Sequence, residues 1–344
     1  MPHLSVLLLM AGLVLPMAAD VGFRWRADVA DEIHRPDMPE AYSMGGIAWV
    51  SNNVYWAVTD EKFKTVVWEL DQPVDAVTGK LGPTRMRILC RPQGSVDIEG
   101  MVRDPLDGSI WLADERDSTI KQYDPLTGRR LSGRVELPAI MTRFVKEFGL
   151  ESLTISRDGL SMWTCSEETL VPDGPIATRR HGAEVRLTRL TRAAAAKPWR
   201  PAGQWVYTTD PIAGKPWYDK KGEDMTRSGV SELCLLEDGT LLVLEREFSV
   251  VLVPRMRCRI YETDFASATE VMGSPSLKTT PDLKRVEKKL LCETTGFAMY
   301  EGMCAGSKLA DGSQTLMLVA DGDKKAFRTI LSIRLSPHTE NLKK

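Results

Sequence analysis

Histidine is scarce in this chain, and the familiar catalytic signatures are missing. There are four histidines, His3, His34, His181 and His338. The sequence has no H-E-x-x-H, G-x-S-x-G or G-x-x-x-x-G-K-[ST] pattern, the signatures of zinc proteases, α/β-class serine hydrolases and P-loop proteins. A catalytic site built without histidine would have to use metal-activated water or a carboxylate base.

A strong charge imbalance is also missing. The formal net charge is -2 at pH 7, so bulk electrostatics favour neither nucleic acid nor an anionic membrane surface as a partner. After the first nineteen residues, no stretch approaches the ~18 uninterrupted apolar residues that a membrane span needs. We therefore expect a mature chain without a membrane span.

The first nineteen residues contain no Asp, Glu, Lys or Arg, and Leu4–Leu15 is an apolar run. Pro16-Met17-Ala18-Ala19 then resembles a signal-peptidase site, although the usual positive residue before the run is absent. The pattern predicts a signal peptide over 1–19 and one domain over 20–344, exported to the periplasm or the extracellular space. A buried N-terminal strand and a membrane anchor are the alternatives.

The chain has six cysteines, and no two of them form a C-x-x-C pair. This spacing argues against a zinc knuckle or thioredoxin-like chemistry. In an exported protein the cysteines could pair as disulfides. Several lie in apolar strand-like runs, where a thiol acts as a small core side chain, so both states stay open.

One unit recurs along the chain at a period of roughly 50 residues, which is typical of a propeller or solenoid. Each copy is a β-rich run with a small or acidic residue, a turn, and a second β-rich run that ends in acid. The copies begin near Gly45, Asp97, Leu150, Ser231 and Tyr300. The strand content predicts an all-β propeller of five four-stranded blades, with 134–137 as the outer strand of the second blade and a sixth degenerate blade as an alternative. The alternation in Val21–Ala27 predicts an N-terminal strand that closes the ring against the last blade.

Two rings of carboxylates follow from the repeat. The innermost strand of a blade lines the central channel, and we expect the first ring there: Glu99, Glu151, Glu232 and Glu301, with Gly45 or Gly46 in the first copy. The second ring ends the second strands: Asp60, Asp114 or Glu115, Glu167, Glu245 and Asp321. Crowded carboxylates need protonation, a cation or a metal, and hard oxygen ligands suit Ca²⁺. The alternative is that each acid binds backbone N–H groups of the next blade.

Basic residues follow several of the acidic strand ends. Lys62, Arg116 and Arg246 each lie within two residues of an acid of the second ring. Arginine suits bidentate binding of phosphate or carboxylate, so we predict these three as substrate-binding residues, with Arg246 foremost. Simple neutralisation of the neighbouring acids is the alternative, and we favour it for the lysines.

Five segments in order resemble the secreted bacterial phytase-like family, also called esterase-like activity of phytase. They are Asp97-Ile98-Glu99-Gly100, Gly149-Leu150-Glu151-Ser152-Leu153, Val230-Ser231-Glu232-Leu233, Leu242-Val243-Leu244-Glu245-Arg246 and Tyr300-Glu301-Gly302-Met303. The resemblance covers roughly 43–335 and implies a β-propeller-like fold, export, and hydrolysis of phosphate or carboxylic esters. The family tends to end its last acidic strand Ser-Asp-Asp-Asn, whereas this chain has Ala320-Asp321-Gly322-Asp323, so Asp323 would replace the amide as a ligand.

These observations support two functional hypotheses. The first is an exported, Ca²⁺-dependent hydrolase of a small phosphorylated or acylated substrate, with strand-end carboxylates around the ion, Glu115 as base and Arg246 on the anionic group. The second is a non-catalytic propeller that binds a ligand, glycan or protein and uses its acids structurally. Function lies in the site rather than the fold, so the arrangement of the acids decides between them. The oligomeric state does not follow from the sequence.

Overall fold

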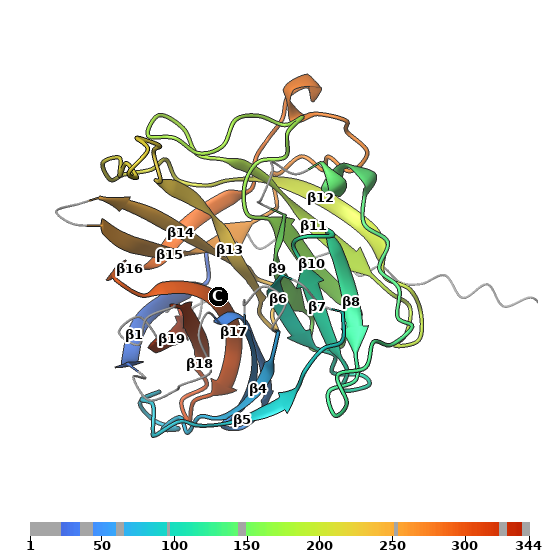
Figure 1. Ribbon diagram of the computed structural model, residues 1–344, viewed down its shortest axis with the longest axis vertical. Helices are drawn as coiled ribbons and strands as arrows, with labels where there is room; N and C mark the ends of the chain where they lie inside the picture. Colours follow the sequence, from blue (N-terminus) through green and yellow to red (C-terminus); the bar gives the residue numbers. More distant parts are fainter. Residues whose placement is uncertain are drawn as a thin grey trace, which may run out of the picture.

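Five antiparallel sheets form a closed ring in the computed structural model (Figure 1). The structure describes residues 22–34, 44–59, 65–94, 97–143, 149–250, 254–322 and 329–338. The first strand of each blade contacts the first strand of the next, from β2 through β6, β9, β13 and β17 back to β2. The predicted all-β propeller is confirmed, with five blades among the described residues rather than six.

Each blade adds its strands outward in chain order, and one blade also takes a strand from the N-terminus. Blade 1 holds β2 (Met44–Ser51), β3 (Val54–Thr59), β4 (Val67–Asp71) and β5 (Arg85–Cys90). Blade 2 holds β6 (Ile98–Arg103), β7 (Ile110–Asp114) and β8 (Thr119–Tyr123). Blade 3 holds β9 (Leu150–Ile155), β10 (Ser161–Ser166), β11 (Glu184–Thr191) and β12 (Arg200–Thr208). Blade 4 holds β13 (Arg227–Leu235), β14 (Leu241–Val250), β15 (Pro254–Asp264) and β16 (Glu287–Gly296). Blade 5 holds β17 (Met299–Lys308), β18 (Gln314–Asp321), β19 (Thr329–Pro337) and β1 (Trp25–His34).

The N-terminal strand closes the ring, as the sequence predicts. β1 pairs antiparallel with β19 and so covers an edge that would otherwise offer unpaired backbone groups. The strand begins at Trp25, later than the alternating run suggested. Just before it, the Glu262 carboxylate of β15 accepts hydrogen bonds from Arg24 N at 2.6 Å and Trp25 N at 3.1 Å, which fixes the approach to the closing strand.

Blade 2 departs from the four-stranded prediction. The segment expected as its outer strand, 134–137, instead forms a parallel bridge from Val135 to Trp199, at the entry to β12 of blade 3. Trp199 is fully buried and packs edge-on against Trp111 at 6.3 Å between ring centroids. The 134–137 segment therefore pairs with the backbone at Trp199, whose side chain packs between blades 2 and 3.

Two short 3-10 helices, η1 (Ala139–Thr142) and η2 (Leu277–Thr279), lie in the connections. Among the described residues, no helix has the length and apolar character to span a membrane. The predicted signal peptide at 1–19 lies outside the described residues.

The six cysteines are all unpaired, and four of them are buried. Two act as hydrogen-bond acceptors between inner strands: the Cys234 thiol accepts from the backbone of Ala305, and the Cys304 thiol from that of Trp49. Thr154 does the same for Leu235 N at 2.9 Å. Cys234, Cys304 and Thr154 thus join the inner strands of neighbouring blades.

Candidate functional site: an acidic mouth of the central channel

Near its start, each inner strand has a β-bulge in its pairing with the second strand of the blade. These bulges determine where the inner-strand acids lie. The pairing with the second strand shifts at Gly45, Glu99, Glu151, Ser231 and Glu301. A β-bulge re-aims the side chain of its extra residue. Three of the five bulge residues are glutamates, all buried, so one end of the channel receives carboxylates from blades 2, 3 and 5.

This register corrects the first predicted ring. Glu232 follows the bulge of blade 4, in the position that Gly46, Gly100 and Gly302 occupy in other blades. Its Oε1 accepts hydrogen bonds from Leu153 N and Leu233 N, both at 2.9 Å. Burial raises the pKa of the Glu232 carboxyl well above its ordinary value. Glu232 therefore joins blade 4 to blade 3 in its interior, the structural role that was the alternative reading of these acids.

The register also revises the second ring. In each blade, the residue just before the bulge pairs with a residue of the second strand, and the next residue of the second strand belongs to the second ring. These next residues are Glu115, Glu167, Arg246 and Asp321 in blades 2 to 5. The corresponding residue of blade 1, Asp60, lies outside the described residues. Blade 4 therefore contributes a cation where the other described blades contribute an acid. Its bulge residue, Ser231, is uncharged as well.

Asp114 and Glu245 lie one residue earlier and meet lysines instead. Asp114 Oδ2 is 2.9 Å from Lys121 Nζ, and Glu245 Oε1 is 2.7 Å from Lys288 Nζ. Glu245 also accepts from the Tyr207 hydroxyl at 2.6 Å. Neither residue belongs to the groups of acids that converge on a common point in the described part of the chain, so the geometry does not support them as metal ligands.

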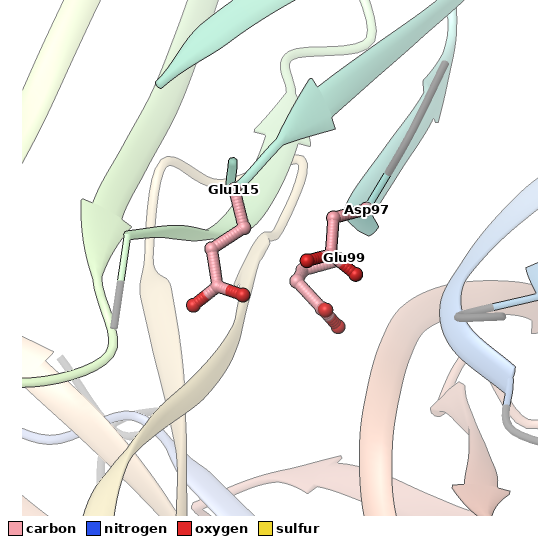
Figure 2. Close-up of side chains that lie close together, drawn as sticks. All are labelled: Asp97, Glu99 and Glu115. Atoms are coloured by element: carbon pink, nitrogen blue, oxygen red, sulfur yellow. The ribbon is translucent and has the colours of Figure 1, made fainter. Parts of the chain in front are cut away.

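Two groups of acids do converge. In each group, ligand oxygens lie within 4.8 Å of one another: Asp97, Glu99 and Glu115 in one, and Glu115, Glu151 and Glu167 in the other. Figure 2 shows Glu115 facing Asp97 and Glu99 across a common space at the ends of neighbouring strands. We call these five acids, with Glu301 and Arg246, the acidic mouth.

Glycines make room for the second group. A Cβ on Gly149 would lie 2.8 Å from Glu115 Cγ, and one on Gly229 would lie 2.7 Å from Glu167 Cγ. Glu115 Oε1 also accepts a hydrogen bond from Gly149 N at 2.8 Å. Each glutamate therefore lies against the backbone of the following blade, which only a residue without a side chain permits.

Arg246 supplies the positive charge of the mouth. Its guanidinium nitrogens lie 2.6 Å from Glu167 Oε1, 3.1 Å from Glu301 Oε1 and 3.8 Å from Glu151 Oε1. These carboxylates hold the pKa of Arg246 well above its ordinary value, even though burial opposes the charge. Both terminal nitrogens of Arg246 already face carboxylates. Its main role is therefore to neutralise these acids, and not to bind an anionic substrate with both nitrogens.

One acid of the mouth and one acid beside it were not predicted as such. Asp97 lies just before β6, and its carboxylate converges with those of Glu99 and Glu115. Its signal in the sequence is the short spacing of two carboxylates, Asp97-Ile98-Glu99. Glu168 follows Glu167 and is 1% exposed. Burial, reinforced by Glu167, raises the pKa of Glu168 to about 7.

The remaining predicted residues divide into two sets. Glu301 and Asp321 are in the described part, Glu301 buried beside Arg246 and Asp321 at the end of β18, and Arg116 is exposed next to Glu115. Lys62 and Asp323 lie outside the described residues, as Asp60 does.

Residues 41–324 match the family described as Phytase-like: esterase-like activity of phytase. The chain belongs to the phytase-like family. No curated protein matches it. The resemblance inferred from the five segments is thus confirmed over most of the chain.

Solved structures share only the general fold. Hydrazine synthase of Kuenenia stuttgartiensis is 12% identical, with a TM-score of 0.36 over 82% of this chain and 57% of that one. Periplasmic gluconolactonase of Pseudomonas aeruginosa is 11% identical, with a TM-score of 0.37 over 92% and 98%. The PQQ-bound aldose sugar dehydrogenase of Streptomyces coelicolor is 11% identical, with a TM-score of 0.39 over 91% and 98%. Likeness at this level carries no argument about activity.

Proposed function

We propose that this protein is an exported, Ca²⁺-dependent hydrolase of small phosphate or carboxylic esters that acts at the acidic mouth. The observation that carries the proposal is the convergence of five carboxylates from blades 2 and 3 within 4.8 Å in each group. Membership of the phytase-like family supports ester hydrolysis.

The donor set fits a hard cation. Carboxylate oxygens are the ligands that Ca²⁺ prefers, and crowded buried acids gain from a cation beside them. Asp97 and Glu99, 6% and 8% exposed, would hold the ion. When bound, such an ion supplies Lewis-acid polarisation of an ester oxygen.

The other residues of the mouth position charge and protons. Glu115 is half-buried and belongs to both converging groups, so it is the carboxylate best placed to accept a proton from an attacking water. Arg246 holds Glu151, Glu167 and Glu301 in place. Arg116 is exposed beside Glu115, and its guanidinium would contact an anionic substrate group at the rim.

A thermal melt with EDTA and then Ca²⁺ tests the ion, and hydrolysis of p-nitrophenyl phosphate, p-nitrophenyl acetate and phytate tests the reaction. We expect Ca²⁺ to raise the melting temperature and to support turnover. Glu99→Gln should abolish the Ca²⁺-dependent shift. Glu115→Gln should keep most of the shift and lower turnover by about 100-fold or more, the range for a lost general base. Glu136→Gln, an exposed acid of the 134–137 segment, is the control.

A second function is favoured by the carboxylates that bind backbone groups. Glu115, Glu232 and Glu245 accept hydrogen bonds from Gly149 N, Leu153 N and Asp210 N, as expected of struts between elements. If the wild-type protein shows neither a Ca²⁺ shift nor turnover, the hydrolase proposal fails. A non-catalytic propeller that binds a ligand is then the better account.

A further inference from the structure

A cavity of about 380 Å³ occupies the other end of the channel. All five inner strands line it, through residues that follow the bulges by two or more positions. Small-molecule sites have volumes of about 300–1,000 Å³, so the cavity is large enough for a compact organic ligand. We call it the distal cavity, and it shares no lining residue with the acidic mouth.

The walls of this cavity combine apolar side chains with polar ones such as Thr154, Ser156 and Gln314. Met101, Leu153 and Met303 come from three different blades and line it together with Ile155 and Ala305. Methionine side chains are flexible and polarisable, and they adapt to ligands of varied shape. The apolar part of the wall therefore suits a hydrocarbon or aromatic body.

The rim of the cavity is cationic. Three cations, Arg103, Arg157 and Lys308, line it with a single carboxylate, Glu237. Glu237 already serves two of them: it forms an ion pair with Arg157 and another with Lys308 at 2.8 Å. Among the lining residues of the described chain, positive charge thus exceeds negative charge.

Two hydrogen-bond donors at the cavity have no acceptor. The Arg103 Nε and the Trp49 Nε1 are both buried without a partner in the described part of the protein. Each follows the bulge of its own inner strand by four residues, and β2 and β6 are in contact, so both donors lie on the same side of the ring. A buried donor without a partner is unfavourable, and an acceptor group of a ligand that reaches it would relieve this cost.

We propose that the distal cavity binds a small amphipathic organic anion, a carboxylate with an aliphatic or aryl tail. The tail lies between the inner strands, and the carboxylate faces Arg103 and Trp49 at blades 1 and 2. The proposal is independent of the hydrolase function, because it concerns the opposite end of the channel and requires neither an ion nor turnover.

Isothermal titration of the mature protein with octanoate tests this proposal. Acetate lacks the tail and octanamide lacks the charge, so both should bind at least about tenfold more weakly than octanoate. Equal affinity for octanoate and octanamide would overturn the anion assignment. Failure of octanoate to bind at millimolar concentration would overturn the site.

Three variants locate the binding. Arg103→Gln should weaken octanoate about tenfold, and Ala305→Phe, at a partly buried wall position, should abolish binding by filling the cavity. Arg87→Gln, whose side chain is 70% exposed on β5, should bind like the wild type. A thermal melt of each variant shows that it is folded. If folded Ala305→Phe binds octanoate as tightly as the wild type, the ligand lies elsewhere and the proposal is wrong.

Discussion

The two ends of the central channel are built from the same five strands and have opposite chemistry. At the start of the inner strands, bulges direct Glu99, Glu151 and Glu301 into a crowded acidic mouth. A few residues later the same strands present methionines, leucine and alanine, with arginines at the rim. The comparison shows that the bulges determine which end carries the inner-strand glutamates.

Blade 4 shows the limit of that rule. It has the bulge, yet it places Ser231 where blades 2, 3 and 5 place glutamates, and Arg246 where the same blades place acids. Because each carboxylate near another raises the cost of ionisation, a ring made only of acids would be strained. Arg246 of blade 4 therefore offsets the repulsion among the carboxylates of the acidic mouth. Replacing this arginine is the strongest test of the difference between the two ends.

Arg246→Met should have the largest effect. It removes the cation beside Glu151, Glu167 and Glu301 and leaves buried carboxylates uncompensated, a change that costs about 3–5 kcal/mol when a buried ion pair is broken. Urea unfolding measures the loss.

The same unfolding experiment is repeated with added Ca²⁺. A divalent ion should stabilise the Arg246→Met variant more than the wild type, because it replaces the lost positive charge. Arg87→Met, an exposed arginine paired with Glu69, is the control and should change stability by less than about 1 kcal/mol. A loss equally small for Arg246→Met would show that the acids of the mouth do not depend on this cation.

A second prediction concerns the boundary between the two ends. Gly302 lies between Glu301 of the mouth and Met303 of the cavity, and a Cβ there would lie 2.8 Å from Val319 Cγ2 and 3.0 Å from Ile47 N of the next blade. Gly302→Ala should therefore destabilise the protein by about 1–3 kcal/mol through overpacking, as measured by urea unfolding. Gly296→Ala in β16, where a Cβ would meet nothing within 4 Å, is the matched control. Equal stability of the two variants would contradict the close strand contact.

The repeat made the fold predictable from the sequence. Blade number, ring closure and the acidic end all follow from the recurrence of short segments such as Tyr300-Glu301-Gly302-Met303. The pairing register of the inner strands could not be predicted as easily from the sequence. Glu232 was grouped with Glu99, although Ser231-Glu232-Leu233 aligns with Glu99-Gly100-Met101 only when the serine takes the bulge.

Other features depend on contacts that no local pattern encodes. Arg246 belongs to the second ring because it lies opposite Gly229, and the sequence alone could not separate it from Glu245. The outer strand expected at 134–137 is not part of the sheet of blade 2, and Val135 instead forms a bridge with Trp199, far along the chain. The distal cavity was not predicted at all, since most of its lining residues read as ordinary strand residues.

The third prediction is the smallest and concerns Glu232, which lies between the two ends. Burial raises the pKa of its carboxyl well above the ordinary value, so the folded protein holds this proton more tightly than the unfolded chain, where glutamate titrates near ~4.3. Its contribution to stability is therefore fully present below that unfolded pKa and is lost as pH rises through the folded pKa.

Glu232→Gln keeps an acceptor for Leu153 N and Leu233 N and cannot titrate. Urea unfolding at acidic and at neutral pH should show near-equal stability at the acidic end and a relative gain for the variant as pH rises. Glu136→Gln, exposed and outside the ring, should show no such trend. A constant difference between Glu232→Gln and the wild type across this range would mean that Glu232 does not hold a proton in the folded protein. The boundary between the two ends would then carry a buried charge, and the separation of an acidic mouth from an uncharged channel interior would be wrong.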